Sequence, residues 1–181
     1  MERRAAPRLE TARLILRAIE PDDLSAYAAM MADPDTVRFL GGATLSREDS
    51  WRKLLTNPGL WAWLGYGYWA VERKEDGRLI GQLGFGEFRR DMAPAIEGIP
   101  EMGWAFHIDV AGRGYASEAA AVALEWIDEA LAPVEIAAII DEANAASIRV
   151  AEKAGFNEHR PATYRGEPIL LYLRRRTGAA Q

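Results

Sequence analysis

Apolar and polar residues along the first third of the chain predict a strand followed by two helices. The segment at 13–19, RLILRAI, has the leucine and β-branched content of a short strand. Proline and aspartates then form an acidic first turn for a helix over 21–31. A capping box, Ser-x-x-Asp at 46–49, predicts a second helix around 51–55. Because proline and glycine disfavour helix interiors, we expect this helix to end at 57–59, Asn-Pro-Gly.

The middle of the chain predicts an antiparallel hairpin. Apolar strands at 66–73 and 78–88 are joined by Lys-Glu-Asp-Gly, and an Asp-Gly pair between strands is a strong hairpin signal. The stretch at 89–100 contains prolines and a glycine and is typical of a loop. The next segment, EMGWAFHI at 101–108, predicts another strand, with Gly103 as a candidate β-bulge.

The last third of the chain predicts alternating helices and strands. An alanine-rich helix is expected over 115–131, because its apolar residues fall on one helical stripe. A strand at 134–140 and a helix at 144–154 follow, and strands at 157–164 and 167–174 form a closing hairpin.

This order of elements predicts one α/β domain with a mixed (α+β) sheet. The sheet is largely antiparallel and contains one right-handed β-α-β crossover. A length of 181 residues fits one domain with a substantial core. We place that domain at 9–174 and expect flexible ends at 1–8 and 175–181.

The composition of the chain excludes several classes of function. The 49% apolar content fits a soluble protein, and no apolar run is long enough to cross a bilayer or to act as a secretory signal. We therefore expect a cytoplasmic protein with no membrane partner. The chain has no cysteine, which excludes disulfides, thiolate zinc sites and a cysteine nucleophile. A formal charge of -5 favours cationic partners such as amines over nucleic acid.

The turn before the alanine-rich helix, VAGRGYASEAAA at 110–121, permits three interpretations. One is geometry alone, because strand-to-helix turns often contain glycine. A second is a dinucleotide fold, but the third glycine of that fingerprint is Ser117, and Glu135 begins a strand instead of ending one. A P-loop fits worse, because no Gly-Lys-Ser/Thr follows. The third is an anion cradle, because the first N–H groups of a helix bind phosphates.

A family resemblance favours the anion cradle. The chain resembles GNAT-superfamily N-acetyltransferases, of the branch similar to the RimJ/RimL ribosomal-protein acetyltransferases. That family's coenzyme loop is Q/R-x-x-G-x-G/A, which this chain matches at Gly114 and Ala116, whereas Ala111 departs at the first position. The other similar blocks are LETARLILRAIEPDDL, GYGYWAVERKEDGRLIGQLGF, EMGWAF and NAASIRVAEKAGF.

The resemblance implies acetyl-CoA as co-substrate, no metal, and direct attack by a primary amine in a ternary complex. Glu101 then holds the position of a general base, acting directly or through water, because an ammonium group must lose a proton before it can attack a thioester. Ser147 would donate a hydrogen bond to the departing thiolate, with Tyr164 or a water as alternatives. Many GNAT enzymes use a tyrosine where this chain has Ala151.

The resemblance also implies a slot between the strands at 101–108 and 134–140. There the two strands diverge and the pantetheine arm pairs with free backbone groups, while an N–H near Phe106 would stabilise the oxyanion. The residues expected to contact coenzyme A are Phe106, His107, Ile108, Arg113, Gly114, Tyr115, Ala116 and Asn144.

Each candidate also has a structural interpretation. Glu101 can be a salt-bridged strand residue, and Asn144 with Ser147 can be a helix cap and a small helix residue. The aromatic residues at 61–69 either fill the core or line the acceptor pocket. His107 and His159 show no metal-ligand spacing.

The acceptor and the class of activity stay open from sequence alone. The acceptor is either a protein N-terminal α-amine or a small-molecule amine, and the chain is either a monomer or a homodimer. The departures at Ala111 and Ala151 leave a second class open, a non-catalytic acyl-CoA sensor or interaction module.

Overall fold

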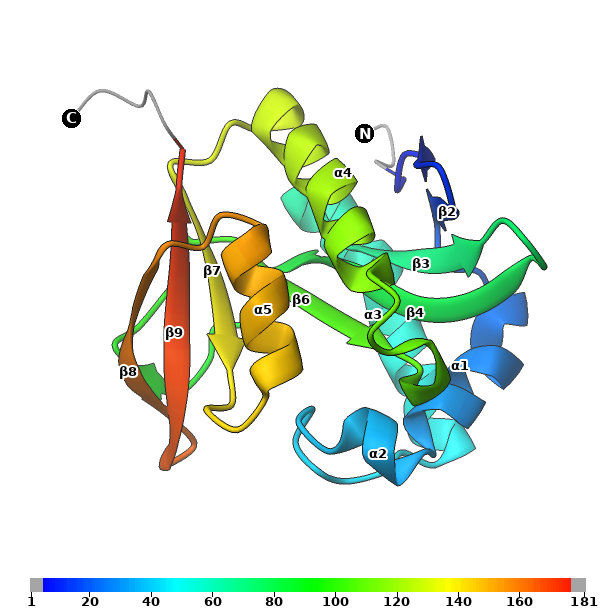
Figure 1. Ribbon diagram of the computed structural model, residues 1–181, viewed down its shortest axis with the longest axis horizontal. Coiled ribbons are helices and arrows are strands. Elements are labelled where there is room, and N and C mark those ends of the chain that lie inside the picture. The colour runs from blue at the N-terminus through cyan, green and yellow to red at the C-terminus, as the bar shows by residue number, and fades with distance from the viewer. Residues whose placement is uncertain (1–4, 177–181) are drawn as a thin grey trace.

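One mixed sheet of nine strands runs through the described part of the protein, residues 5–176 of the computed structural model (Figure 1). The strands lie in the order β1-β2-β3-β4-β6-β7-β9-β8-β5. All neighbours pair antiparallel except β6 and β7, which are parallel. The mixed α/β fold predicted from the sequence is therefore confirmed. The strands are β1 (Leu9–Glu10), β2 (Leu14–Arg17), β3 (Tyr68–Arg73), β4 (Arg78–Gly86), β5 (Met92–Ala93), β6 (Glu101–Phe106), β7 (Glu135–Ile140), β8 (Glu158–Tyr164) and β9 (Glu167–Arg175).

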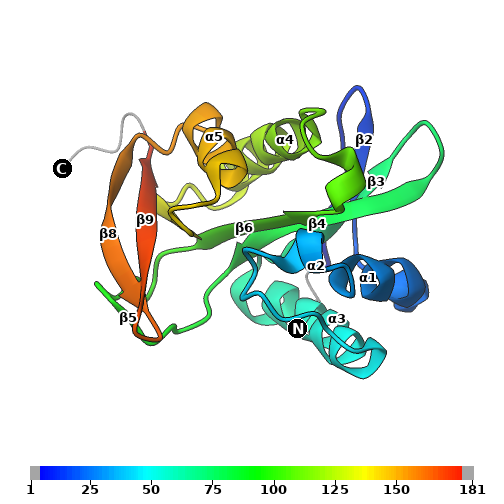
Figure 2. The same cartoon turned by 60° about the horizontal axis from the view of Figure 1, so that its bottom comes forward.

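Helices cover both faces of the sheet. Figure 2 shows α4 and α5 on one face and α1, α2 and α3 on the other. The predicted stripe of α4 is confirmed, because Ala119, Ala123 and Ile127 are fully buried. Alanine on this stripe lets the helix axis approach the sheet closely. The helices are α1 (Leu24–Met31), α2 (Pro34–Val37), α3 (Arg47–Leu64), α4 (Tyr115–Ala130) and α5 (Ala145–Lys153), with short 3-10 helices at Pro21–Asp23 and Ile108–Val110.

The prediction that the second helix ends at 57–59 is wrong. Its start is confirmed, since Ser46 Oγ accepts from the amide of Asp49 at 3.0 Å, but α3 continues through Pro58 to Leu64. Pro58 has no N–H for the carbonyl of Leu54 one turn earlier. The buried side chain of Asn57 lies within 3.5 Å of that carbonyl and donates to it. The asparagine thus supplies the donor that the proline removes.

The remaining predicted strands and helices are confirmed with small changes at their ends. The hairpin at Asp76-Gly77 joins β3 to β4, and Gly77 has a φ of +69°, as its turn requires. The predicted loop at 89–100 contains the short strand β5, which pairs with β8. In the last third, β7, α5 and the hairpin of β8 and β9 all form as expected.

The two central strands diverge as predicted. In the described residues, β6 and β7 pair at Glu101 with Ala137 alone, although each strand continues beyond this point. The far side of β6 pairs with β4 over its whole length, from Glu101 to Phe106. One edge of β6 is therefore left without strand partners beyond Glu101, which opens a slot toward β7.

The candidate bulge at Gly103 is wrong. The pairing of β4 with β6 keeps one register, with Gly103 opposite Gly84, and the irregularity of this region lies between Val71 and Glu72 instead. The lack of a side chain at 103 matters for another reason. A Cβ atom there would lie 2.3 Å from the hydroxyl oxygen of Tyr68, so the residue admits that tyrosine against the sheet.

The predicted flexible ends, 1–8 and 175–181, lie partly outside the described residues. Within the described range, the Trp69 indole donates to the carbonyl of Pro7 at 2.7 Å, and Ala6 packs against the core. At the other end, Arg175 is the last residue of β9. Between residues 5 and 176, no helix combines the length and the apolar character needed to cross a membrane.

Candidate active site

Glu101 lies at the apex of the slot, where β6 and β7 meet, and is held by an ion pair. Its side chain is 6% exposed, and its two oxygens accept from Arg90 Nε at 2.6 Å and Nη2 at 2.7 Å. This fork-to-fork pairing fixes the plane of the carboxylate. The salt-bridge interpretation of Glu101 is therefore confirmed, and the role of general base remains a prediction. Each oxygen keeps a further lone pair for a water or an amine.

Aromatic rings surround this ion pair. The Arg90 guanidinium carbon lies 4.9 Å from the ring centroid of Phe88 and 4.8 Å from that of Tyr164, at cation–π distance. Burial raises the pKa of the Tyr68 phenol, and the charge of Glu101 raises it further. Tyr68 is therefore a neutral phenol near the carboxylate. A small pocket beside Glu101 is lined by the loop between β4 and β6, including Ile96 and Ile99.

Arg90 is a site residue that sequence reasoning missed. It lies in the loop between β4 and β6, where no periodic pattern indicates which side chains turn inward. The closely spaced Phe88 and Arg90 gave no signal by themselves, because their shared partner, Tyr164, is distant in the sequence. Tyr164, an alternative proton donor to the thiolate, belongs to this cluster around Glu101.

Ser147 lies on α5 and faces β6 across the slot. Its hydroxyl oxygen accepts from the Trp104 indole nitrogen, 3.2 Å away. Its backbone N–H donates to Asn144 Oδ1 at 3.0 Å, so the cap interpretation of Asn144 is confirmed. The amide nitrogen of that side chain is left for another partner. Ala151, one turn further along α5, is fully buried and provides no hydroxyl.

The predicted coenzyme contacts at 106–108 differ in what their backbone can offer. The N–H of His107 donates to the carbonyl of Ile80 at 2.9 Å, and the N–H of Ile108 donates to Thr36 Oγ1 at 3.1 Å. Successive residues of a strand direct their N–H groups to opposite edges. Since His107 points to β4, the N–H of Phe106 points into the slot. Phe106 is therefore the backbone donor of this group that faces the slot.

The glycine turn leaves the start of α4 open. Gly114 is the N-cap with a φ of +81°, and no side chain caps the helix there. A Cβ at Gly114 would meet Arg13 Nη2 at 3.5 Å, and one at Gly112, which also has a positive φ, would meet nothing within 4 Å. The first amides of α4, from Tyr115 and Ala116 onward, lack partners within the helix. Open amides of this kind can donate to an anion such as a pyrophosphate.

Arg13 holds this turn in place, and sequence reasoning did not single it out. Its guanidinium donates to the carbonyl of Arg113 at 3.0 Å and pairs with Glu118 at 2.6 Å. It also lies 4.4 Å from the ring centroid of Tyr115. The acidic residue in the first turn of α4 is thus neutralised by Arg13 and leaves the helix start favourable for anions.

Three basic side chains, one in the turn and two on α5, are exposed. Arg113, Arg149 and Lys153 all reach solvent, so each is available to a phosphate. His107 contacts Asp109, and His159 stacks on Tyr172, with ring centroids 5.1 Å apart. In the part of the chain that the structure describes, no group of three or more His, Cys, Asp or Glu residues is arranged to hold a metal ion.

The aromatic residues at 61–69 divide between core and surface. Trp61 and Trp69 are buried and Trp63 is 88% exposed. Tyr68 is the member of this group that lies near Glu101. The core interpretation is therefore confirmed for the two buried tryptophans.

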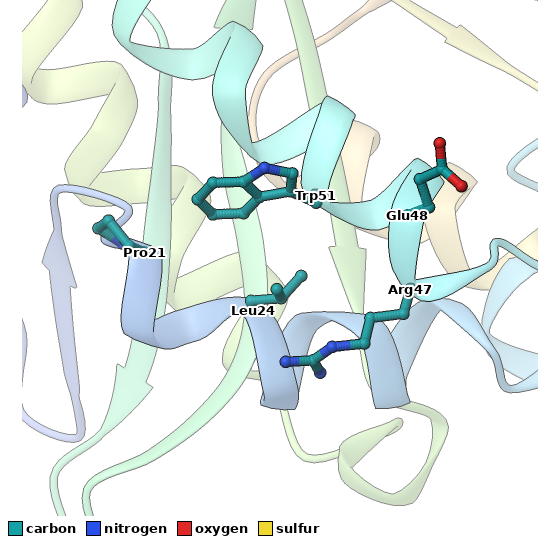
Figure 3. A pocket seen from close by; sticks show the side chains of 5 residues that line it. All are labelled: Pro21, Leu24, Arg47, Glu48 and Trp51. Carbon is teal, nitrogen blue, oxygen red and sulfur yellow. The ribbon is translucent and has the colours of Figure 1, made fainter.

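A second hollow lies away from the slot, between the N-terminal ends of α1 and α3. Figure 3 shows Trp51 and Leu24 forming its apolar floor, with Arg47 and Glu48 at its edge. It contains none of the residues predicted to bind coenzyme A or to act in catalysis. The slot and the glycine turn therefore remain the candidate site.

The topology excludes the dinucleotide interpretation. A doubly wound nucleotide fold has a mostly parallel sheet, whereas here β6 and β7 form the one parallel pair among the described strands. What the site brings together is a held carboxylate at the apex of a slot, a hydroxyl on the facing helix, and an open helix start. These groups suit the binding of a phosphate-bearing chain and a proton transfer at its end.

Comparisons with known proteins support the same conclusion. The chain matches the Acetyltransferase (GNAT) domain family over residues 13–157. It is 31% identical over 180 residues to YkkB of Bacillus subtilis, an uncharacterized protein, covering 94% of this chain and 97% of that protein. A Bordetella pertussis structure assigned to the GNAT acetyltransferases has a TM-score of 0.83 at 28% identity, covering 93% of this chain and 99% of that one.

More distant structures share the fold and were solved with coenzyme A. RimL, a ribosomal L7/L12 alpha-N-protein acetyltransferase, has a TM-score of 0.72 at 16% identity and covers 93% of this chain and 98% of that one. The aminoglycoside acetyltransferase AAC(6')-Ib has a TM-score of 0.72 at 18% identity, with coverage of 90% and 95%. These likenesses show the fold alone. Because the family match spans most of the sequence, the chain belongs to the GNAT acetyltransferase family and is an N-acetyltransferase.

Proposed function

We propose that the protein transfers the acetyl group of acetyl-CoA to a primary amine by direct attack in a ternary complex. The observation that carries this proposal is the divergence of β6 from β7 immediately beyond Glu101. That divergence puts a carboxylate at the apex of a slot whose β6 edge has free backbone groups. Family membership supplies acetyl-CoA as the co-substrate that fits these groups.

Several groups of this chain would hold acetyl-CoA. The amides at the start of α4, behind Gly114, would bind the pyrophosphate, with Arg113 balancing its charge. The backbone of Phe106 would pair with the pantetheine arm or with the acetyl oxygen. The free amide nitrogen of Asn144 would contact the same arm. The Cys-free chain offers no thiol to form an acetyl-enzyme.

In the proposed reaction, the amine nitrogen forms a bond to the acetyl carbon and the carbonyl oxygen takes up negative charge. Before this attack, Glu101 takes the ammonium proton, directly or through a water on its free lone pair, which frees the nitrogen lone pair. The second proton that the nitrogen loses as the amide forms is taken up, through solvent, by the thiolate. As the C–S bond breaks, the hydroxyl of Ser147 donates a hydrogen bond to the departing thiolate. Arg90 keeps the carboxylate oriented throughout.

A second part of the proposal concerns the acceptor of the acetyl group. We infer that the acceptor is an α-amine of a protein N-terminus or a small-molecule amine. We also infer that the chain acts in the cytoplasm as a monomer or homodimer, without a nucleic-acid or membrane partner. The distant likeness to RimL, which acts on a ribosomal protein, is matched by one to an aminoglycoside enzyme. The RimJ/RimL branch therefore stays a hypothesis, supported by the sequence blocks described above.

Thiol release tests this proposal. Purified protein is incubated with acetyl-CoA and a panel of N-terminal peptides and small amines, and free coenzyme A thiol is measured. The chain itself has no cysteine to add background. We expect amine-dependent release with at least one class of acceptor. Binding of acetyl-CoA without release above background for any amine would instead support the sensor alternative.

The glycine turn gives a matched test of the anion cradle. Gly114→Ala places a Cβ at a φ of +81°, and Gly166→Ala does the same at +83° in the hairpin of β8 and β9, on the other side of the sheet. Each substitution destabilises the protein by about 1–2 kcal/mol through the same backbone strain. We expect Gly114→Ala alone to weaken acetyl-CoA binding, on the order of tenfold by calorimetry, because it displaces the helix-start amides. Equal affinities in the two variants would place the pyrophosphate elsewhere.

A further inference from the structure

An indole on β6 reaches α5 beyond the point where β6 and β7 diverge. Trp104 pairs with Leu83 on β4 but lies beyond the one contact between β6 and β7. Its ring nitrogen lies 3.2 Å from Ser147 Oγ on α5. In Figure 1, α5 lies in front of the diverging strands. The bond between Trp104 and Ser147 therefore joins β6 to the helix that carries the candidate proton donor.

The chemistry of the two groups fixes the direction of this bond. An indole N–H donates and has no acceptor, so the hydroxyl oxygen of Ser147 must accept. A serine hydroxyl carries a single hydrogen, which this bond leaves unused. The backbone N–H of Ser147 is also engaged, with Asn144 Oδ1 at 3.0 Å. The residue is thus held from two sides with its hydroxyl proton free to be donated.

We propose that Trp104 is a positioning residue for Ser147. Its N–H occupies a lone pair of the hydroxyl and so directs the hydroxyl proton away from the indole, toward the thiolate that departs in the slot. This inference rests on the proposed function, because it needs a thiolate to receive the proton. Without the indole N–H, the hydroxyl rotates among staggered positions and donates to the thiolate only part of the time.

Trp104→Phe tests this role because it keeps an aromatic ring and removes the donor. We expect kcat to fall about tenfold, within the range for a hydrogen bond to a charged group, while the KM for acetyl-CoA stays unchanged. Acyl donors whose thiols are more acidic need less help in leaving, so the loss shrinks with them. Trp63→Phe, at an exposed position, is the matched control and keeps wild-type kinetics.

A double variant separates positioning from packing. If Trp104 acts through Ser147, then Trp104→Phe in a Ser147→Ala background causes no further loss of kcat. Equal losses in both backgrounds would overturn the inference, as would an unchanged kcat. A lower KM for acetyl-CoA would overturn it too, because the indole would then block the slot. Thermal melting of each variant identifies any loss that comes from unfolding.

A binding measurement tests the role of Trp104 without requiring turnover. In alkaline buffer, where the thiol of coenzyme A ionises, we expect Trp104→Phe to weaken coenzyme A binding more than acetyl-CoA binding, because only the former presents a thiolate. Equal weakening of both would overturn the inference. A wild-type protein that releases no thiol with any amine would overturn the proposed function instead, so the two failures are distinguishable.

Discussion

Replacing Glu101 with glutamine is expected to lower kcat by a hundredfold or more. A positioned general base contributes roughly 10²–10⁴-fold to a proton transfer, and glutamine keeps the shape of the side chain but cannot take up a proton. Initial rates of thiol release at saturating acetyl-CoA measure the effect. Acetyl-CoA affinity should be unchanged, because in the proposed reaction the carboxylate acts on the amine and makes no contact with the coenzyme.

Controls separate the chemistry of Glu101 from its ion pair. Glutamine removes the negative charge and one of the two acceptors that pair with Arg90, 2.6 Å away in the native protein, so some stability is lost and thermal melting must accompany the rates. Glu101→Asp keeps the charge and should retain more activity than Glu101→Gln. Glu129→Gln, the same change at an exposed site on α4, should match the wild type. If Glu101→Gln keeps its rate and its fold, the proton path lies elsewhere.

The parts of the fold that were predicted correctly depend on neighbours in sequence. The Ser46 cap, the Asp-Gly turn and the apolar stripe of α4 are all local patterns, and local patterns fix where elements begin and which face is buried. The diverging strands followed from a resemblance carried by several such blocks together.

The parts that were missed depend on contacts between distant segments. Arg90 reaches Glu101 from an irregular loop and stacks on Tyr164 of a remote hairpin. Trp104 bonds to Ser147 across 43 positions of sequence. No periodicity indicates such pairs, because the residues meet only after the sheet has formed. The helix end at Pro58 was wrong for a local reason instead, since the side chain of the neighbouring Asn57 compensates for the missing donor.

The largest expected effect on stability comes from Trp69, which connects the first strands to α3 and α4. The residue is fully buried on β3, and its ring packs edge-to-face on Trp61 at 4.8 Å and on Trp126 at 5.1 Å between centroids. We expect Trp69→Ala to lower the free energy of unfolding by about 3–5 kcal/mol, because it removes a large apolar surface and leaves a cavity. Urea titration followed by circular dichroism measures this change without relying on tryptophan fluorescence.

Trp63 provides the matched control, since it lies near Trp61 on α3 but is 88% exposed. Trp63→Ala should change the free energy of unfolding by no more than about 0.5 kcal/mol, as is usual for surface positions. Trp69→Phe should fall between the two alanine variants, because it keeps a ring but loses the hydrogen bond to the Pro7 carbonyl. If Trp69→Ala and Trp63→Ala destabilise the protein equally, the aromatic cluster is not the centre of the core, and the packing of α3 and α4 on the sheet must depend on other residues.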